Sequence, residues 1–401
     1  MENLPEINVG VVGHIDHGKT TLLSKLTGKF TDTHSEELKR GITIKLGYTE
    51  TTIYKHGEIF SNKENLNGKR GIPVRYISFI DSPGHEMLMV TMLSGAAVVD
   101  AAILVVAANE GIKPQTREHF IALQAKGVKN IIIVQNKIDL VNSEQALKNF
   151  NEIKQFVKGT FAENAQIIPV SAQQEINIDK IFQTLTSIEI PKRDLKSKPF
   201  FLVARSFDIN KPGTEIKNLK GGVLGGVLKK GELKIGDEIE IKPGINIKKA
   251  HGKTEYKTLN ARIISIKKGA YSLEKIGPGV SVAIETSLDP FLTKADSLSG
   301  CVASTKNNLP EMRYNGKLKV KLFDESFGST NQKKIEPIKM KELLMISINT
   351  TITVGVVEKI SGDDVELSLN IPIVALNGDK AGIARNIEGH WRLIGFGEIV
   401  N

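Results

Sequence analysis

The first half of the chain alternates short apolar runs with longer stretches whose apolar positions recur about every 3.6 residues. The short runs are rich in β-branched residues and predict strands at Ile7–Val12, Tyr76–Ile80, Ala101–Ala107, Asn130–Gln135 and Gln166–Val170. The periodic stretches, such as Thr116–Lys126 and Ser143–Lys158, predict amphipathic helices. Strands that are apolar throughout and separated by helices indicate a mostly parallel sheet with helices on both faces.

The second half has a different pattern, in which many short apolar segments are separated by glycine turns and no long helix is indicated. The basic, proline-bounded stretch Pro191–Pro199 is typical of a linker, and it precedes this second half. The expected strands are Phe200–Phe207, Gly222–Leu228, Glu238–Ile241, Arg262–Lys267, Val280–Glu285, Leu318–Phe323, Glu342–Ile348, Ile352–Val357, Val365–Leu369, Ala381–Asn386 and Trp391–Ile399. Strands at this spacing favour β-barrels, and a boundary near Leu309–Tyr314 divides them. We therefore expect an α/β domain over residues 1–195 and β-barrels over residues 196–308 and 309–401.

Length and composition are those of a globular protein with two or three domains: 401 residues, 40% hydrophobic and 25% charged. The longest apolar run, Gly95–Ala108, is interrupted by Asp100 and is shorter than the roughly 18 residues of a membrane helix. The first residues lack the pattern of a signal peptide. The single cysteine, Cys301, excludes an intrachain disulfide and fits a reducing cytoplasm. The net charge of +9 suggests a polyanionic partner without establishing one.

The segment Gly13-His14-Ile15-Asp16-His17-Gly18-Lys19-Thr20 fits the phosphate-binding pattern G-x-x-x-x-G-K-[ST]. It follows the first expected strand and leads into a helical stretch, Thr21–Leu26, which is the context that the motif requires. Its glycines allow backbone N–H groups to turn onto phosphate oxygens, the helix N-terminus adds a positive dipole, and Lys19 adds a full charge. The alternative, a glycine-rich turn that matches by chance, is opposed by the elements that follow. The residues expected to contact nucleotide here are Gly13, His14, Ile15, Asp16, His17, Gly18, Lys19, Thr20 and Thr21.

A magnesium ion is expected beside this loop, because Thr20 would hold a Mg²⁺ that neutralises the β- and γ-phosphates. Asp81-Ser82-Pro83-Gly84 directly follows a buried strand. Asp81 would reach the ion through water, and the Gly84 N–H would sense the γ-phosphate, although Asp-x-x-Gly alone is more often an ordinary turn. Thr43 in Arg40-Gly41-Ile42-Thr43 is the candidate for a mobile metal ligand. Its alternative role is a solvent-facing threonine at the start of a strand.

His85, directly after the Asp-x-x-Gly turn, is the candidate for orienting or polarising the attacking water. A histidine with a pKa of about 6.5 can act there in its neutral or its protonated form. With Thr43 and Asp81 it completes the expected catalytic set.

Guanine recognition is predicted by Asn136-Lys137-Ile138-Asp139, which follows the strand Asn130–Gln135. The Asp139 carboxylate can accept hydrogen bonds from N1–H and the 2-amino group of guanine, a donor pair that adenine lacks. A site left with an unpaired carboxylate rejects the wrong base by roughly 10⁴-fold or more. Asn136 would brace the loops, and the Lys137 stem would lie over the base. Ser171-Ala172-Gln173, after the last strand, would supply a backbone N–H to guanine O6.

Asp16 is unexpected in a phosphate loop, because its carboxylate lies near phosphates. It either accepts local backbone hydrogen bonds or helps to bind a second cation together with the Gly41 carbonyl.

These motifs together are similar to those of translational GTPases. Within that superfamily the chain resembles the gamma subunits of archaeal and eukaryotic translation initiation factor 2, and the resemblance covers essentially the whole chain. It is carried further by Ser35–Tyr48, His85–Met89, Leu93–Ala97, Val134–Asp139 and Phe200–Gly213.

The resemblance implies an α/β P-loop GTPase domain followed by two β-barrels, with GTP and GDP as cofactors and a cytoplasmic location. It implies that the GTP form carries methionylated initiator tRNA to the small ribosomal subunit and that hydrolysis releases it. The implied partners are the alpha and beta subunits of the same factor and a GTPase-activating factor, since no arginine finger is evident in cis. No membrane partner is expected.

The resemblance also implies an aminoacyl-tRNA site between the GTPase domain and the second domain. Tyr48 is the leading contact there, and its alternative role is ordinary strand packing. Two other functions remain open: an elongation-type or selenocysteine-specific aminoacyl-tRNA carrier, and an interaction scaffold that binds nucleotide without turnover.

One segment departs from the family pattern. The family usually has a cysteine-rich zinc knuckle between the first switch and the Asp-x-x-Gly strand, whereas Thr49–Val74 contains no cysteine and one histidine, His56. A four-ligand zinc site cannot be formed from these residues. We expect no zinc, and either a metal-free ribbon or a flexible loop around the turn residues Asn65-Leu66-Asn67-Gly68.

Overall fold

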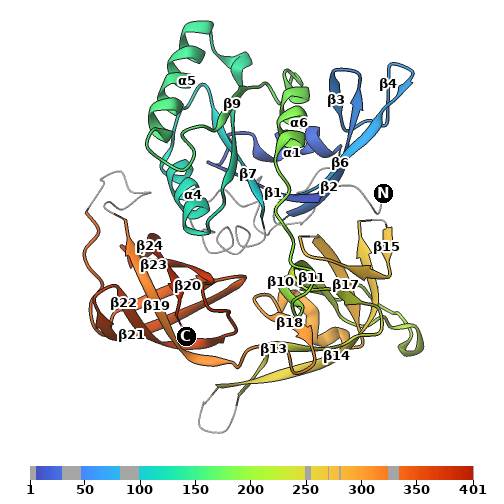
Figure 1. The fold of residues 1–401 in the computed structure, drawn as a ribbon, viewed down its shortest axis with the longest axis vertical. Coiled ribbons are helices and arrows are strands. Elements are labelled where there is room, and N and C mark those ends of the chain that lie inside the picture. Colours follow the sequence, from blue (N-terminus) through green and yellow to red (C-terminus); the bar gives the residue numbers. More distant parts are fainter. Residues whose placement is uncertain are drawn as a thin grey trace. The chain divides into compact units, whose positions relative to one another are not determined.

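The chain forms two compact units in the computed structural model (Figure 1). The first comprises Met1–Pro191, Phe323–Ile335 and Ile387–Ile394, and the second comprises Lys192–Leu322, Glu336–Asn386 and Gly395–Asn401. The structure describes residues 6–28, 47–81, 99–248, 254–269, 271–279, 281–323 and 334–400.

A seven-stranded sheet forms the centre of the first unit, in the order β3-β2-β6-β1-β7-β8-β9. Its parallel strands are β1 (Glu6–Gly13), β6 (Ile72–Asp81), β7 (Ala101–Ala107), β8 (Asn130–Asn136) and β9 (Gln166–Pro169). All seven residues of β7 are buried, as its continuous apolar run predicts. Parallel strands place their carboxyl ends at one edge of the sheet, and the predicted motifs follow those ends.

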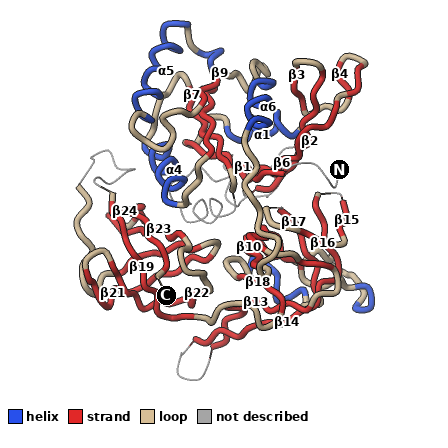
Figure 2. Tube along the Cα trace, viewed as in Figure 1, coloured by secondary structure: helices blue, strands red, loops and turns tan. Residues whose placement is uncertain are grey.

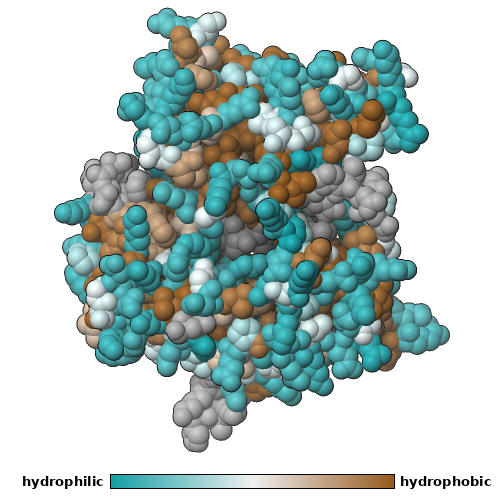
Figure 3. Space-filling model, viewed as in Figure 1, coloured by the Kyte–Doolittle hydropathy of each residue, from teal (hydrophilic) through white to brown (hydrophobic). Residues whose placement is uncertain are grey.

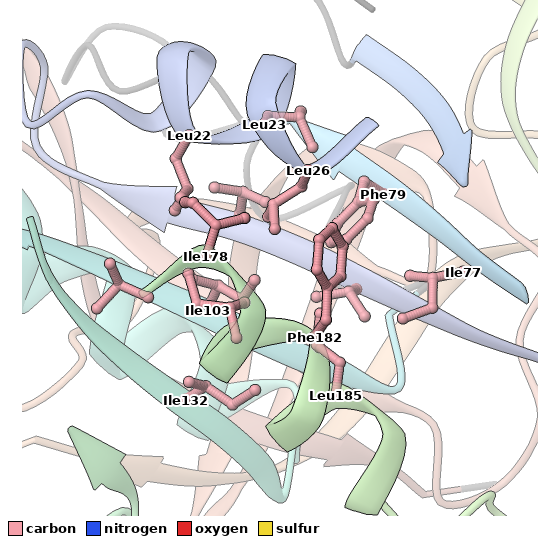
Figure 4. Close-up of a cluster of buried hydrophobic side chains, with 14 of the residues drawn as sticks. Leu22, Leu23, Leu26, Ile77, Phe79, Ile103, Ile132, Ile178, Phe182 and Leu185 are labelled. Atoms are coloured by element: carbon pink, nitrogen blue, oxygen red, sulfur yellow. The ribbon is translucent and has the colours of Figure 1, made fainter. Parts of the chain in front are cut away.

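Helices cover both faces of this sheet (Figures 1 and 2). They are α1 (Lys19–Thr27), α4 (Pro114–Ala125), α5 (Ser143–Val157) and α6 (Ile178–Ser187). Figure 4 shows side chains of α1 and α6 directed toward the sheet, among them Leu22, Leu26 and Phe182. Helix α5 begins at a capping box, because Asn142 Oδ1 accepts from the Gln145 N–H and the Gln145 side chain accepts from the Asn142 N–H. The mostly parallel, helix-covered sheet predicted from the sequence is confirmed.

The cysteine-free segment between β2 and β6 forms a ribbon of short strands. Strand β2 (Gly47–His56) pairs antiparallel with β6, and β3 (Ile59–Ser61) pairs with the end of β2. Strands β4 (Asn65–Leu66) and β5 (Lys69–Arg70) form a hairpin through Asn67 and Gly68, which both have positive φ angles. Of the two expected structures, the ribbon is the one observed.

The first barrel of the second unit closes in the order β13-β18-β10-β11-β17-β14, because β14 pairs back onto β13. The strands are β10 (Phe200–Phe207), β11 (Val223–Lys230), β13 (Glu238–Lys248), β14 (Thr254–Lys268), β17 (Ser281–Thr286) and β18 (Val302–Thr305). Three shorter strands, β12 (Leu233–Lys234), β15 (Tyr271–Leu273) and β16 (Lys275–Ile276), lie beside it. Alternate apolar residues of these strands fill the barrel interior.

A second closed barrel follows, in the order β19-β22-β21-β20-β23-β24. Its strands are β19 (Arg313–Leu322), β20 (Leu343–Ile348), β21 (Thr351–Ser361), β22 (Asp364–Ile373), β23 (Lys380–Ile387) and β24 (His390–Ile399). The predicted fold class, an α/β domain followed by two β-barrels, is therefore confirmed. Single-turn helices occur at Ile138–Leu140 (η2) and Ile216–Asn218 (η3), and a longer helical stretch at Pro290–Asp296 (η5).

Hydrophilic side chains are spread over the face drawn in Figure 3, with hydrophobic ones in patches between them. Among the described residues, no helix is long and apolar enough to span a membrane.

Candidate nucleotide-binding site

The phosphate loop runs from the end of β1 to the start of α1, and two glycines fix its path. Gly13 has a φ of 142° and Gly18 a φ of 86°, values that favour glycine. A Cβ on Gly13 would lie 2.4 Å from the carbonyl oxygen of Val105, and one on Gly18 would lie 2.4 Å from the side-chain nitrogen of Asn136. Both positions therefore require glycine, because the ends of β7 and β8 approach the loop closely.

Lys19 and Thr20 open α1 and bring a cation and a hydroxyl to the loop. The Lys19 side chain is buried, and its Nζ donates to the main-chain carbonyl of His14 at 2.6 Å. Thr20 Oγ1 donates to Asp81 Oδ2 at 3.3 Å, and Asp81 is fully buried at the end of β6. A hydroxyl and a carboxylate are oxygen ligands of the kind that Mg²⁺ prefers. Thr20 and Asp81 therefore fit the metal role predicted for them.

Asn136 links the phosphate loop to the two loops expected to hold the base. Its Nδ2 donates to the carbonyl of His17 at 2.9 Å, and its Oδ1 accepts from the Ala172 N–H at 3.0 Å. Ser171 and Ala172 are buried, whereas Gln173 is exposed. The sequence motifs at the ends of β1, β8 and β9 thus meet at one edge of the sheet, where Asn136 links the loops. The buried Asn136 amide therefore hydrogen-bonds to both of the other loops from the end of β8.

Asp139 and Lys137 are the side chains expected to recognise guanine. Asp139 is exposed within η2, and Lys137 takes a left-handed backbone with a φ of 61°. Lys137 Nζ lies 3.4 Å from Glu110 Oε1, and Lys113 Nζ lies 3.9 Å from Glu110 Oε2. Glu110 therefore orients Lys137, while the Asp139 carboxylate remains accessible to a base.

His17 is fully buried in the loop, and its imidazole is neutral. Burial lowers its pKa from 6.5 to about 3, and the nearby His14 and Lys19 act in the same direction. Its Nδ1 lies 3.3 Å from the carbonyl oxygen of Val105, which places the ring proton on Nδ1. Its Nε2 lies 3.9 Å from Glu110, but a neutral ring forms no ion pair with that carboxylate. His17 thus packs the loop against β7 rather than supplying charge.

Asp16 has a left-handed backbone, with a φ of 61°, and an exposed side chain. Aspartate tolerates this conformation better than most residues do, so the residue has a conformational reason to be there. Its carboxylate as a ligand of a second cation remains a prediction.

Four predicted site residues lie outside the described part of the chain: Gly41, Thr43, Gly84 and His85. The main chain of Tyr48 pairs with Ile80 between β2 and β6, and its side chain is outside the described part. The catalytic set of Thr43, Asp81 and His85 is therefore described only at Asp81.

Sequence reasoning missed two side chains of α4 that contact the phosphate loop. Gln115 Oε1 accepts from the Ile15 N–H at 3.3 Å, and His119 Nδ1 accepts from the Gly13 N–H at 3.0 Å. The signal in the sequence is the spacing of four residues, which places both side chains on one face of the helix. The spacing alone does not show that this face contacts the phosphate loop, because that contact is made only in the folded sheet.

The fold and the site define a nucleotide-binding protein of the phosphate-loop class. Residues 4–191 match the family model for the elongation factor Tu GTP-binding domain, and residues 315–399 match that for the C-terminal part of initiation factor eIF2 gamma. The chain is 50% identical to translation initiation factor 2 subunit gamma of Methanothermobacter thermautotrophicus, over all of both chains. It is 49% identical to the protein of the same name in Thermoplasma acidophilum, over 98% of this chain and 97% of that one. The chain belongs to the family of translation initiation factor 2 gamma subunits.

Solved structures of translational GTPases share the fold at lower identity. A bacterial selenocysteine-specific elongation factor matches 99% of this chain and 58% of its own, with a TM-score of 0.75 and 24% identity. Elongation factor SelB of Methanococcus maripaludis, solved with a GTP analogue, matches 99% of this chain and 79% of its own, with a TM-score of 0.74 and 24% identity. These likenesses support the fold, whereas the closer sequence matches define the family.

Proposed function

We propose that this GTPase carries methionylated initiator tRNA to the small ribosomal subunit in its GTP form and releases it after GTP hydrolysis. Its role as an initiation-factor GTPase follows from its family. The observation that supports the nucleotide half of the proposal most strongly is the pair of hydrogen bonds made by Asn136. They join the phosphate loop to the loop after β9, and Asn136 begins the motif that contains the exposed Asp139.

Lys19 binds the β- and γ-phosphates in this proposal, because its buried ammonium already lies against the loop that would surround them. Thr20 and Asp81 hold Mg²⁺, which shields phosphate charge when it is bound. Asp139 accepts from N1–H and the 2-amino group of guanine, and the loop Ser171-Ala172-Gln173 donates to O6. Asp16, with the Gly41 carbonyl, remains the candidate for a second cation.

The switch residues complete the proposal. Thr43 binds the metal while the γ-phosphate is present, and the Gly84 N–H senses that phosphate. His85 orients the attacking water. A GTPase-activating factor accelerates the step, since no arginine finger is evident in the sequence.

The proposed macromolecular partners are initiator methionyl-tRNA, the alpha and beta subunits of the same factor, and the small ribosomal subunit. Family membership is their main support, and the net charge of +9 agrees with an RNA ligand. Tyr48 is the proposed tRNA contact, at a strand position next to the Asp81 end of β6.

Filter binding of charged tRNAs with GTP or GDP, over a series of salt concentrations, tests this function. We expect initiator methionyl-tRNA to be retained with GTP, released with GDP, and bound more weakly as salt rises, because phosphate contacts release counterions. Lys19→Ala should abolish GTP binding and GTP-dependent retention. Lys25→Ala is the matched control, because Lys25 lies on the same helix but pairs with Glu175. Equal retention with either nucleotide would refute the proposal.

The second candidate, a selenocysteine-specific or other elongation-type carrier, has the fold likeness in its favour. Competition between initiator and elongator charged tRNAs separates the two. A preference for elongator species would replace the initiation role with this one.

A further inference from the structure

Two side chains of α4 accept hydrogen bonds from alternate residues of the phosphate loop. Gln115 and His119 lie one helical turn apart and so face the same neighbour. His119 accepts from the Gly13 N–H at 3.0 Å and Gln115 from the Ile15 N–H at 3.3 Å. All four residues belong to the first compact unit.

A phosphate loop works through the direction of its N–H groups, because these form the concave surface that receives phosphate oxygens. An N–H bonded to α4 does not point at a phosphate. By holding the N–H groups of Gly13 and Ile15, α4 determines the curvature of the loop between β1 and α1. We propose that Gln115 and His119 are positioning residues that hold the phosphate loop in its nucleotide-binding curvature.

The chemistry of His119 suits a permanent acceptor. Its side chain is buried, and burial, with Lys19 acting in the same direction, lowers its pKa to about 3. The ring therefore stays neutral near pH 7. An Nδ1 that accepts from Gly13 requires the ring proton to be on Nε2. A protonated ring would have no acceptor and would release the Gly13 N–H.

The position of Gln115 is held by the start of the helix. Pro114 occupies the first turn of α4, where its fixed φ is favourable and its missing N–H is not needed. Gln115 is half-buried, so it is more tolerant of substitution than His119. Removing the His119 acceptor leaves a buried N–H unpaired, and removing the Gln115 acceptor leaves a partly buried one. A loss of this kind should change nucleotide affinity by about tenfold to a hundredfold at the buried bond.

The test measures GDP and GTP affinity and the GDP dissociation rate with a fluorescent nucleotide, in the full chain. His119→Leu and Gln115→Leu should each weaken binding about tenfold or more and speed dissociation. His119→Asn should recover most of the affinity, because an asparagine Oδ1 lies close to the position of the histidine Nδ1 and can accept from Gly13. Thr116→Val is the control on the same helix, because Thr116 is buried but takes no part in these two bonds.

Two further measurements separate positioning from general stability. Thermal unfolding without nucleotide detects variants that lose the fold, and nitrogen NMR of labelled histidine should show His119 with its proton on Nε2. Wild-type affinity in both leucine variants would overturn the inference, as would an asparagine variant that folds normally but binds as poorly as the leucine variant. The inference rests on nucleotide binding alone. A wild-type chain that binds no guanine nucleotide would instead refute the proposed function.

Discussion

The side-chain amide of Asn136 donates to the main-chain carbonyl of His17 at 2.9 Å, inside the sheet edge where the phosphate loop meets β8. The other end of the same amide accepts from the Ala172 N–H. One buried side chain thus joins three loops that are far apart in the sequence, so their mutual position depends on it.

Asn136→Ala should weaken GTP binding by roughly tenfold or more and destabilise the first unit, because each buried polar group left unpaired costs about 1–3 kcal/mol. Gln135→Ala is a matched control. Gln135 is the preceding buried residue of β8, and its Nε2 donates to Ala146 O and Asn149 Oδ1 on α5 instead. We expect the control to lose stability with little change in affinity. Calorimetric titration and thermal unfolding of both variants measure the difference, and equal losses of affinity would contradict the linking role of Asn136.

Base choice should depend on the Asp139 carboxylate. Asp139→Asn replaces an acceptor with an amide whose NH₂ faces the 2-amino group of guanine, so GTP affinity should fall by roughly 10²-fold or more. Xanthosine triphosphate carries an oxygen at that position and should bind the variant better than GTP does. Because Asp139 is exposed, folding should be unaffected. Competition titrations with the two nucleotides measure the exchange, and an unchanged preference for GTP would remove Asp139 from base recognition.

The parallel sheet was predictable because its strands are apolar throughout, and Ala101–Ala107 was predicted with the bounds of β7. The motif residues were placed correctly at strand ends because parallel strands end at one edge. Strand β2 was not predicted, since Thr49, Thr51 and Thr52 are polar residues that are buried in the sheet. Gln115 and His119 were missed for a similar reason: their role depends on a tertiary contact that hydrophobic periodicity does not encode.

Stability should decrease in mild acid because of two buried histidines. The pKa values of His17 and His119 are lowered by burial from 6.5 to about 3 in the folded chain. The contribution of these two neutral histidines to the free energy of unfolding is fully present above about pH 6.5. It is lost as the pH falls toward 3, because only the unfolded histidines take up protons in that range. Within that range the free energy of unfolding falls by about 1.4 kcal/mol per pH unit for each histidine.

His119→Asn removes one of these titrations while keeping an acceptor for Gly13. The thermal unfolding midpoint should therefore fall less between pH 7 and pH 5 in this variant than in the wild type. The same fall in both would show that His119 is protonated equally in the folded and unfolded chain.

The two barrels should be coupled through Asp379, which is buried within the second unit. It accepts from Lys229 Nζ at 2.6 Å, Asn349 Nδ2 at 2.7 Å and the Leu376 N–H at 2.9 Å. Lys229 is half-exposed, so Lys229→Ala should cost only about 1 kcal/mol. Asp379→Ala leaves two further donors unpaired and should cost about 2–4 kcal/mol. Urea unfolding measures the loss of unfolding free energy in each variant. A larger loss in Lys229→Ala than in Asp379→Ala would contradict the coupling role of Asp379.

Cys301 should be inert in the folded protein. It is buried in the first barrel, where burial raises its thiol pKa to about 12 and its Sγ–H donates weakly to the Gly244 carbonyl at 3.8 Å. The thiolate is the reactive form, and a thiol with so high a pKa stays protonated at pH 8. Ellman's reagent should therefore find no reactive thiol in the native chain and one in denaturant, because Cys301 is the single cysteine. Rapid labelling of the native chain would mean that β18 opens readily to solvent, against the closed barrel that its pairing with β10 and β13 forms.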